Sequence, residues 1–273
     1  MSAVRCRRDR KQPPGDRIEM TLPHMVNSMR IMDSPSLDEK FHAVLFDLDG
    51  VLTPTALIHM RAWQEMLNEE LSRDQNPYTD EDYFAYVDGK PRYNGVRDFF
   101  ASRGITLPEG DPSDGPAAQT ICGLGNRKND LFNTVLARDG IQPYPGSRRW
   151  VDRLHESGMA MAVVSSSRNA AAVLKAAGMV EDFSVLVDGN RSKTERLPGK
   201  PAPDTYLRGA ELLGVPAEQC VVVEDAVSGV RAGAAGGFGM VLGVNRGVGA
   251  DRLREAGADR VVDDLDEMVE EMA

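Results

Sequence analysis

Two aspartates separated by a single residue follow a short apolar run in this chain. The run Ala43–Phe46 is followed by Asp47, Leu48, Asp49 and Gly50. In open α/β sheets, ligands and chemistry gather where parallel strands end. A glycine after the second aspartate lets the chain bend so that carboxylates and a backbone carbonyl converge on a hard cation such as Mg²⁺. The motif predicts an α/β fold with a cation site at its first strand end, where one carboxylate is free to attack phosphorus.

Short, valine-rich apolar runs alternate with helical patterns from Phe41 onward. This alternation is typical of a Rossmann-like, doubly wound parallel sheet. The predicted strands are residues 43–46, 159–164, 221–223, 240–244 and 261–262. The predicted crossover helices are residues 150–157, 169–177, 204–213, 227–235 and 250–256.

One internal stretch and one end of the chain break this rhythm. Residues 57–140 show helical patterns around 60–71, 96–102 and 129–138 but no buried strand, and they return through a proline-rich crossing at 142–146. Residues 1–38 are basic and lack an apolar period, which is typical of a disordered tail. We therefore expect a tail (1–38), an α/β core domain (39–57 and 141–273) and an inserted helical cap domain (58–140).

Bulk properties exclude several classes of partner. A net charge of −10 and a pI near 5.0 argue against nucleic acid, which requires clustered cationic surface. Three cysteines without metal-ligand spacing argue against a disulfide framework or a zinc site. No apolar stretch approaches the roughly 20 residues needed to span a bilayer. We expect a cytoplasmic protein, a monomer, with no membrane partner.

Polar residues of complementary kinds follow three of the predicted strands, and a lysine precedes a predicted helix between the second and third of these strands. Carboxylates, hydroxyls and one ammonium meeting at a sheet edge can supply metal ligands, a nucleophile, a proton carrier and phosphate donors. Taken singly, each has an ordinary explanation: a turn, a helix cap or a surface lysine. Their order and their placement at strand ends together predict phosphoryl transfer. These residues are Asp47 and Asp49, then Ser165, Ser166 and Ser167, then Lys200 between two prolines, and finally Glu224 with Asp225.

The same residues resemble the four motifs of the haloacid dehalogenase superfamily over roughly residues 41–265, and within it the β-phosphoglucomutase group with a helical cap. The resemblance implies that Asp47 is the phosphorylated nucleophile and Asp49 the general acid and base, which also contacts Mg²⁺ through its backbone carbonyl. It further implies that Asp47 and Asp225 are metal ligands and that Glu224 supports the metal site. Ser165, Ser166 and Lys200 would bind the transferring phosphate.

The insertion also resembles the cap of that group. The run Arg127-Lys128-Asn129-Asp130 matches a motif that touches the sugar phosphate, and His59 lies in a match to the start of the cap. The resemblance assigns substrate contacts to six residues: His59, Arg92, Lys128, Ser167, Arg168 and Asn169. From the residues alone, His59 is equally a packing residue, and the lesser alternative for Lys128 and Arg92 is an ordinary solvated charge.

Two features depart from the pattern of that group. Pro54 stands where an acid usually precedes Thr55, and the stretch 101–125 is longer than expected, with several prolines and glycines. We expect the first to alter the behaviour of the hinge and the second to reshape substrate choice.

Three functions follow from these residues. The leading expectation is a Mg²⁺-dependent β-phosphoglucomutase acting on a small sugar phosphate through an aspartyl-phosphate and a bound bisphosphate. The first alternative is a sugar-phosphate phosphatase, since Asp49 can activate water as well as a sugar hydroxyl. The second is a receiver-like signalling module, which also gathers acids, a hydroxyl and a lysine but is shorter and places its acceptor aspartate on a later strand.

Overall fold

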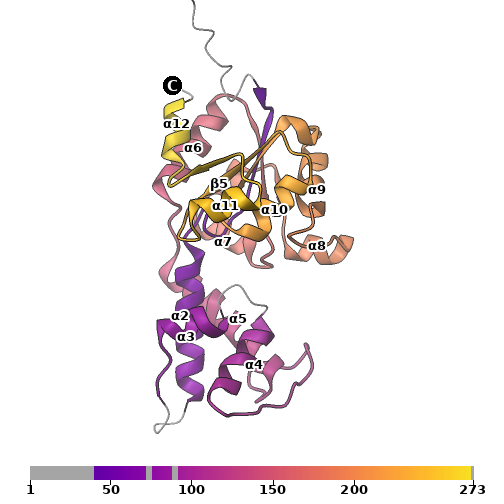
Figure 1. The fold of residues 1–273 in the computed structure, drawn as a ribbon. Coiled ribbons are helices and arrows are strands. Elements are labelled where there is room, and N and C mark those ends of the chain that lie inside the picture. The colour runs from indigo at the N-terminus through magenta and orange to yellow at the C-terminus, as the bar shows by residue number, and fades with distance from the viewer. Residues whose placement is uncertain (1–39, 72–75, 88–91, 272–273) are drawn as a thin grey trace, which may run out of the picture. The chain divides into compact units, whose positions relative to one another are not determined.

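Six parallel strands form the central sheet, in the order β3-β2-β1-β4-β5-β6. Figure 1 shows the chain with the helices that surround this sheet. The computed structural model describes residues 40–71, 76–87 and 92–271. The predicted tail, residues 1–38, lies outside them. The strands are β1 (Ala43–Phe46), β2 (Ala160–Val164), β3 (Val185–Val187), β4 (Cys220–Glu224), β5 (Met240–Val244) and β6 (Arg260–Val262). The predicted α/β class with a parallel sheet is confirmed.

The five-strand prediction was wrong by one strand. It omitted β3, which is only three residues long, lies at the edge of the sheet and has just one buried residue. A run this short gives little apolar signal. The helices α8 (Gly189–Glu195) and α12 (Asp266–Glu271) were also not predicted.

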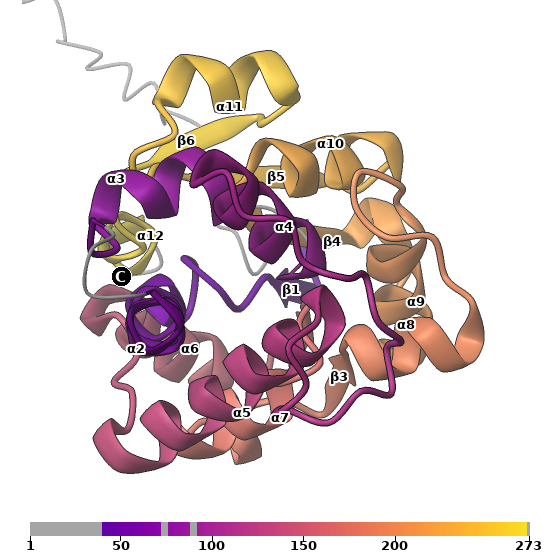
Figure 2. The same cartoon turned by 90° about the horizontal axis from the view of Figure 1, so that it is seen from below.

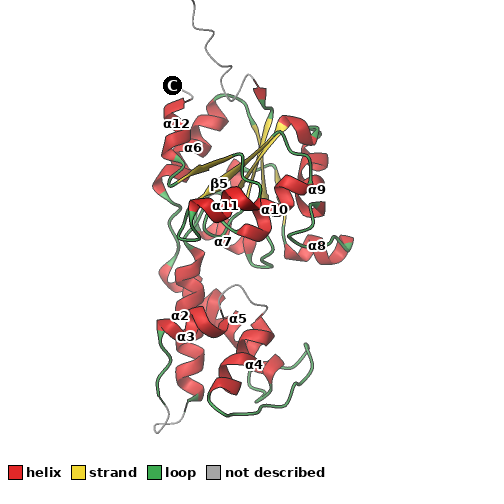
Figure 3. Cartoon of the chain, in the orientation of Figure 1, coloured by secondary structure: helices red, strands yellow, loops and turns green. Residues whose placement is uncertain are grey.

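Helices cover both faces of the sheet, as Figure 3 shows. Successive strand residues point to opposite faces. Val44 and Phe46 pack with one set of helices, and Ala43 and Leu45 pack with the other. The first set is α6 (Pro145–Glu156), α7 (Ala170–Ala176) and α12, and the second is α9 (Asp204–Leu213) and α10 (Val227–Ala235). The helix α11 (Ala250–Ala256) packs on α10, and the short turns η2 (Val180–Asp182) and η3 (Ala217–Gln219) complete this part.

A helical segment is inserted between β1 and β2. Its elements are α2 (Thr55–Glu70), α3 (Asp80–Asp82), η1 (Tyr83–Val87), α4 (Arg92–Ser102) and α5 (Ile121–Asp139), several of which are seen in Figure 2. The helix α5 packs against both α2 and α4. Trp63, Met66 and Leu67, which fall at helical spacing, are buried in a hydrophobic cluster with Phe99 and Leu124. The segment therefore has a hydrophobic core of its own.

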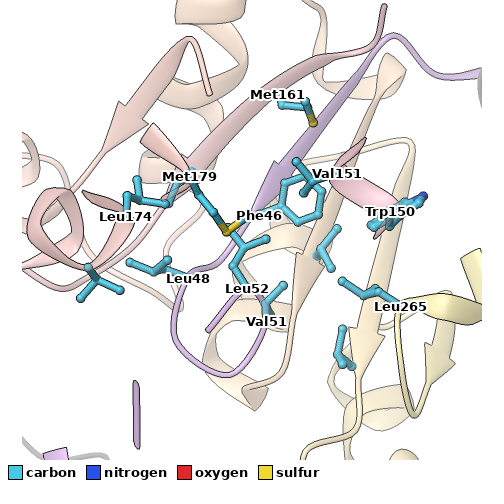
Figure 4. Packing of buried hydrophobic residues seen from close by; sticks show 14 of the residues in the cluster. Phe46, Leu48, Val51, Leu52, Trp150, Val151, Met161, Leu174, Met179 and Leu265 are labelled. Carbon is cyan, nitrogen blue, oxygen red and sulfur yellow. The ribbon is translucent and has the colours of Figure 1, made fainter. Parts of the chain in front are cut away.

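The loop after β1 is anchored in the main core. Leu48, Val51 and Leu52 are fully buried in the same cluster as Phe46, which meets Trp150 edge to face at a centroid distance of 5.3 Å (Figure 4). The apolar residues of the loop point inward, so its aspartates stay at the edge of the sheet. Packing thus holds the polar side chains in place. In the described part of the chain, no helix is both long and apolar enough to cross a membrane.

Candidate active site

The candidate site lies where the strand order reverses. The chain runs from β1 outward through β2 to β3 and then returns to β4 on the other side of β1. A reversal of this kind leaves a crevice beyond the carboxyl ends of the two central strands. Asp47 follows β1 and its backbone N–H donates to the Val223 carbonyl at 2.9 Å, while Glu224 is the last residue of β4. Both side chains are buried at this edge.

Lys200 joins the two carboxylates. Its Nζ donates to Asp47 Oδ1, to Glu224 Oε1 at 2.6 Å and to the Val164 carbonyl at 3.1 Å. The lysine side chain is 8% exposed and the two acids are 9% and 1% exposed. Burial alone would favour the neutral amine, but the adjacent charges of Asp47 and Glu224 hold the pKa of Lys200 well above its usual value. The ammonium therefore stays charged at the centre of the site.

Tyr206, on α9, contacts both Glu224 and Lys200. Its hydroxyl donates to Glu224 Oε1 at 3.0 Å, and its ring lies 4.8 Å from Lys200 Nζ. The backbone N–H of Ala226 donates to the other Glu224 oxygen at 3.1 Å. Glu224 therefore has donors on both oxygens, as a buried charge requires.

Three carboxylates form what we call the acid triangle: Asp47, Glu224 and Asp225 each place an oxygen within 4.8 Å of the others. Burial and the neighbouring Glu224 charge raise the pKa of Asp225 to about 7. Burial also raises the pKa of Asp47, against the effect of Lys200. Concentrated, poorly solvated negative charge on hard oxygen donors suits a divalent cation such as Mg²⁺.

Gly50 makes room for this triangle. It has φ +83, and a β-carbon at this position would lie 1.9 Å from Asp225 Oδ2. Only glycine can bring the loop backbone this close to the carboxylate.

The Asp49 side chain is hydrogen-bonded to Thr55. Its Oδ1 accepts a hydrogen bond from the Thr55 hydroxyl at the start of α2. Burial raises the pKa of Asp49, while the Thr55 hydrogen bond and the charge of Lys200 act in the opposite direction. The carboxyl is thus placed at the point where the chain leaves the sheet for the helical segment.

The three serines after β2 lie along one loop, but they differ in burial and in hydrogen-bond partners. Ser165 is buried, its backbone N–H donates to the Val187 carbonyl at 2.9 Å, and its Oγ accepts from the Ser167 N–H at 3.0 Å. Ser167 Oγ in turn accepts from the Asn169 N–H at 3.1 Å. Ser166 is exposed.

One cavity of about 320 Å³ is lined by three residues at which we expected substrate contacts and by two residues of the matched cap motif. The first three are Arg92, Arg168 and Asn169, and the other two are Asn129 and the acid Asp130. Asn169 Nδ2 donates to Asn129 Oδ1 at 3.1 Å. Two guanidinium groups and several amides suit a phosphate or other oxyanion.

Lys128, which is buried, and His59, which is partly buried, form a separate pair. Lys128 Nζ lies 2.6 Å from His59 Nδ1 and 5.3 Å from the centres of both the Trp63 and Phe132 rings. Lys128 is 5% exposed, so it is not an ordinary solvated charge. Burial and the nearby charge of Arg92 lower its pKa to about 7. Burial and the charge of Lys128 lower the pKa of His59 well below its usual value.

Sequence reasoning missed three residues that contact the site: Thr55, Tyr206 and Arg246. Thr55 and Tyr206 gave no separate signal, because each fits the pattern of its own helix. Arg246 comes two residues after β5, so the rule that singled out the other strand ends would have found it. Its Nε donates to the Gly50 carbonyl at 3.0 Å.

A family model for haloacid dehalogenase-like hydrolases matches residues 41–237. The chain belongs to this family. It is an enzyme of the haloacid dehalogenase superfamily and falls in the β-phosphoglucomutase-like subgroup. Family membership supports phosphoryl transfer as the general chemistry, and it does not fit the receiver-like alternative.

Named relatives carry two different activities. A β-phosphoglucomutase of Mycobacterium tuberculosis is 47% identical over 244 residues, covering 85% of this chain and 93% of the relative. Hexitol phosphatase A of Escherichia coli is 32% identical over 226 residues, covering 82% and 91%. The crystal structure of a Rhodobacter sphaeroides CbbY variant with xylulose-1,5-bisphosphate matches with a TM-score of 0.61 and 26% identity, covering 83% of this chain and 96% of that one. This haloacid dehalogenase-family chain is thus similar to both mutases and phosphatases.

Proposed function

We propose that this protein is a Mg²⁺-dependent β-phosphoglucomutase that interconverts β-glucose 1-phosphate and glucose 6-phosphate through an aspartyl-phosphate on Asp47. One observation carries the proposal: the buried Asp47 carboxylate belongs to the acid triangle and at the same time contacts Lys200. A nucleophile between a cation site and an ammonium can approach an anionic phosphoryl group without prohibitive repulsion. The similarity to a mycobacterial β-phosphoglucomutase supports the choice of substrate.

In the first step, an Asp47 oxygen bonds to phosphorus as the bond from phosphorus to the leaving oxygen breaks. Asp49 gives a proton to that leaving oxygen. In the second step, Asp49 takes the proton of another sugar hydroxyl, whose oxygen attacks the same phosphorus and releases Asp47. Bound at the acid triangle, with the Asp49 backbone carbonyl as a further ligand, Mg²⁺ would neutralise charge on the phosphoryl oxygens. Lys200, with Ser165 and Ser166, would hold those oxygens.

A mutase must also bind the phosphate that is not being transferred. We propose the cavity lined by Arg92, Arg168 and Asn169 for this role, because two guanidinium groups in its lining can bind phosphate oxygens. Ser167 orders the loop that presents Asn169. His59 and Lys128 would contact the sugar. A bisphosphate held at both ends could then present either phosphate to Asp47.

We further propose that residues 58–140 act as a cap domain over a core domain of residues 39–57 and 141–273. The hydrophobic cluster around Trp63 and Phe99 lies within the helical segment and supports this division, while Ile58 of α2 and Phe132 of α5 belong to the main cluster and join the segment to the core. Opening would admit the substrate, and closure would exclude water and bring Asp49 to the leaving oxygen.

A phosphatase acting on sugar phosphates is the second candidate. The similarity to hexitol phosphatase A favours it, since Asp49 could activate water in place of a sugar hydroxyl. The two candidates differ only in what discharges the aspartyl-phosphate.

Phosphorus NMR separates the candidates. The protein is incubated with Mg²⁺ and β-glucose 1-phosphate, with and without a trace of glucose 1,6-bisphosphate. We expect glucose 6-phosphate to appear only with bisphosphate, and a metal chelator to stop the reaction. Inorganic phosphate as the sole product would instead establish the phosphatase. Asp47→Asn should abolish turnover, whereas the matched control Asp251→Asn, at a side chain that is 92% exposed, should not change it. Wild-type turnover by Asp47→Asn would refute the nucleophile.

A further inference from the structure

Arg246 lies outside every motif that the sequence singled out, yet it connects three parts of the chain. Its Nε donates to the Gly50 carbonyl at 3.0 Å, and its Nη1 donates to the Asp263 carbonyl at 3.2 Å and to Asp264 Oδ2 at 3.3 Å. Its guanidinium carbon lies 3.9 Å from the centre of the Tyr144 ring. The side chain is 18% exposed. These contacts join the loop after β1, the loop before α12 and the crossing that returns from the helical segment.

The loop after β1 is held at three successive carbonyls. The Gly50 carbonyl accepts from Arg246, the Val51 carbonyl accepts from the Ser147 hydroxyl at 2.6 Å, and the Leu52 carbonyl accepts from the Tyr144 N–H at 2.9 Å. Tyr144 belongs to the returning crossing, and Ser147 lies in the first turn of α6. The Arg246 guanidinium stacks on the Tyr144 ring. The outgoing and returning connections of the helical segment are therefore fastened to each other beside the site.

The Gly50 peptide also lies close to the Asp225 carboxylate. A β-carbon on Gly50 would lie 1.9 Å from Asp225 Oδ2, so a small shift of this peptide changes the room left for that carboxylate. The hydrogen bond from Arg246 acts on the carbonyl of the same residue. By fixing the position of the Gly50 peptide, Arg246 therefore influences the geometry of the acid triangle without contacting the three carboxylates.

We propose that Arg246 is a positioning residue: it clamps the Gly50 peptide to the returning crossing and so holds the acid triangle in register for a divalent cation. The metal-binding part rests on the proposed function. A planar guanidinium can donate in three directions while it stacks on an aromatic ring, whereas a lysine ammonium offers a single point of charge. Lysine should therefore not replace arginine here.

Metal binding to the protein without substrate tests the clamp. Mn²⁺, which serves as a paramagnetic probe of the cation site, is titrated into metal-free protein and free Mn²⁺ is followed by electron paramagnetic resonance. Removing a group that orients a metal ligand typically weakens binding by 10–100-fold. We expect Arg246→Ala and Arg246→Lys each to raise the Mn²⁺ Kd by about tenfold or more, and Tyr144→Leu to raise it by a smaller factor. The control Arg254→Ala, at an exposed side chain that pairs with Asp251 three residues away, should leave the Kd unchanged.

A merely structural role would give another pattern. Arg246→Lys and Tyr144→Leu would then lower the melting temperature but bind Mn²⁺ within twofold of wild type, and that result overturns the proposal. If Arg246→Ala does not fold, the other two variants decide. In turnover, we expect kcat to fall while KM for the sugar phosphate stays within about twofold, because Arg246 is not among the residues that line the Arg92 cavity. Failure of the wild type to turn over sugar phosphates would overturn the proposed function and still leave the Mn²⁺ comparison decisive for Arg246.

Discussion

Replacing Lys128 by methionine should stabilise the protein while it impairs binding of the substrate. The amine is 5% exposed, and its pKa is lowered from 10.5 to about 7, by burial first and then by the charge of Arg92, with Asp49 acting in the opposite direction. The difference makes the charged amine of the folded protein about 5 kcal/mol less favourable than that of the unfolded chain. Methionine has a similar length and no charge, so Lys128→Met should be more stable than wild type at pH 7, by up to about 4 kcal/mol.

The gain in stability should shrink as the pH rises. Unfolded Lys128 keeps its proton up to a pH near 10.5, whereas the folded side chain loses it near pH 7. Between these values the unfolded state binds more protons, so the free energy of unfolding of the wild type rises with pH. From pH 7 to pH 9 this rise amounts to about 2 kcal/mol. His59, whose pKa is lowered well below 6.5, does not titrate in this window.

Urea unfolding at pH 7, 8 and 9 measures this effect. The difference between Lys128→Met and wild type should fall by about 2 kcal/mol across the series. Lys175→Met, at an exposed lysine on α7, is the matched control and should show no such trend. A pH-independent difference, or a methionine variant less stable than wild type at pH 7, would refute the reasoning from burial. In activity assays the variant should show a raised KM for the sugar phosphate.

Two further substitutions probe the core of the site. Gly50→Ala places a β-carbon 1.9 Å from Asp225 Oδ2 and demands a φ of +83, so calorimetric titration should show Mg²⁺ binding weakened at least tenfold, and unchanged binding would contradict the close approach. Tyr206→Phe removes the 3.0 Å hydrogen bond to Glu224. It should lower the free energy of unfolding by about 1–3 kcal/mol in a denaturant titration, and no loss would mean that this donor is dispensable.

Elements that are buried and long enough were predictable from the sequence. The strand β1 matches its predicted range, and β4 and β5 agree closely, because their valine-rich runs are buried on both faces. The strand β3 escaped notice for the opposite reason: two of its three residues are only partly buried. Helix α8 begins after Asp188, whose side chain accepts from two backbone N–H groups. That capping signal is local and lacks the apolar periodicity on which the helix predictions depended.

The polar residues at the sheet edge were predictable because strand ends of a parallel sheet must meet. Contacts within the helical segment were not. The approach of Lys128 to His59 depends on how α5 packs on α2, and helix packing is set by side chains spread over both helices. Gly125 illustrates the difficulty: a β-carbon there would lie 2.5 Å from the Tyr93 ring, so the spacing of α4 and α5 beside Arg92 depends on one missing methyl group. Nothing in the residue order reveals this.

The charge arrangement at the centre of the site follows from the register of two strand pairs. Phe46 of β1 is paired with Val163 of β2 and with Val223 of β4. The next position on each strand therefore stands at one level, and the groups at that level are the Asp47 carboxylate, the Val164 carbonyl and the Glu224 carboxylate. These are the three groups that Lys200 Nζ contacts. A slip of one residue between β1 and β4 would turn one strand's side chains to the opposite face and leave a buried charge without its partner. A slip between β1 and β2 would move the Val164 carbonyl out of line with Lys200. The valines that fix the register thus determine this constellation as much as the charged residues do.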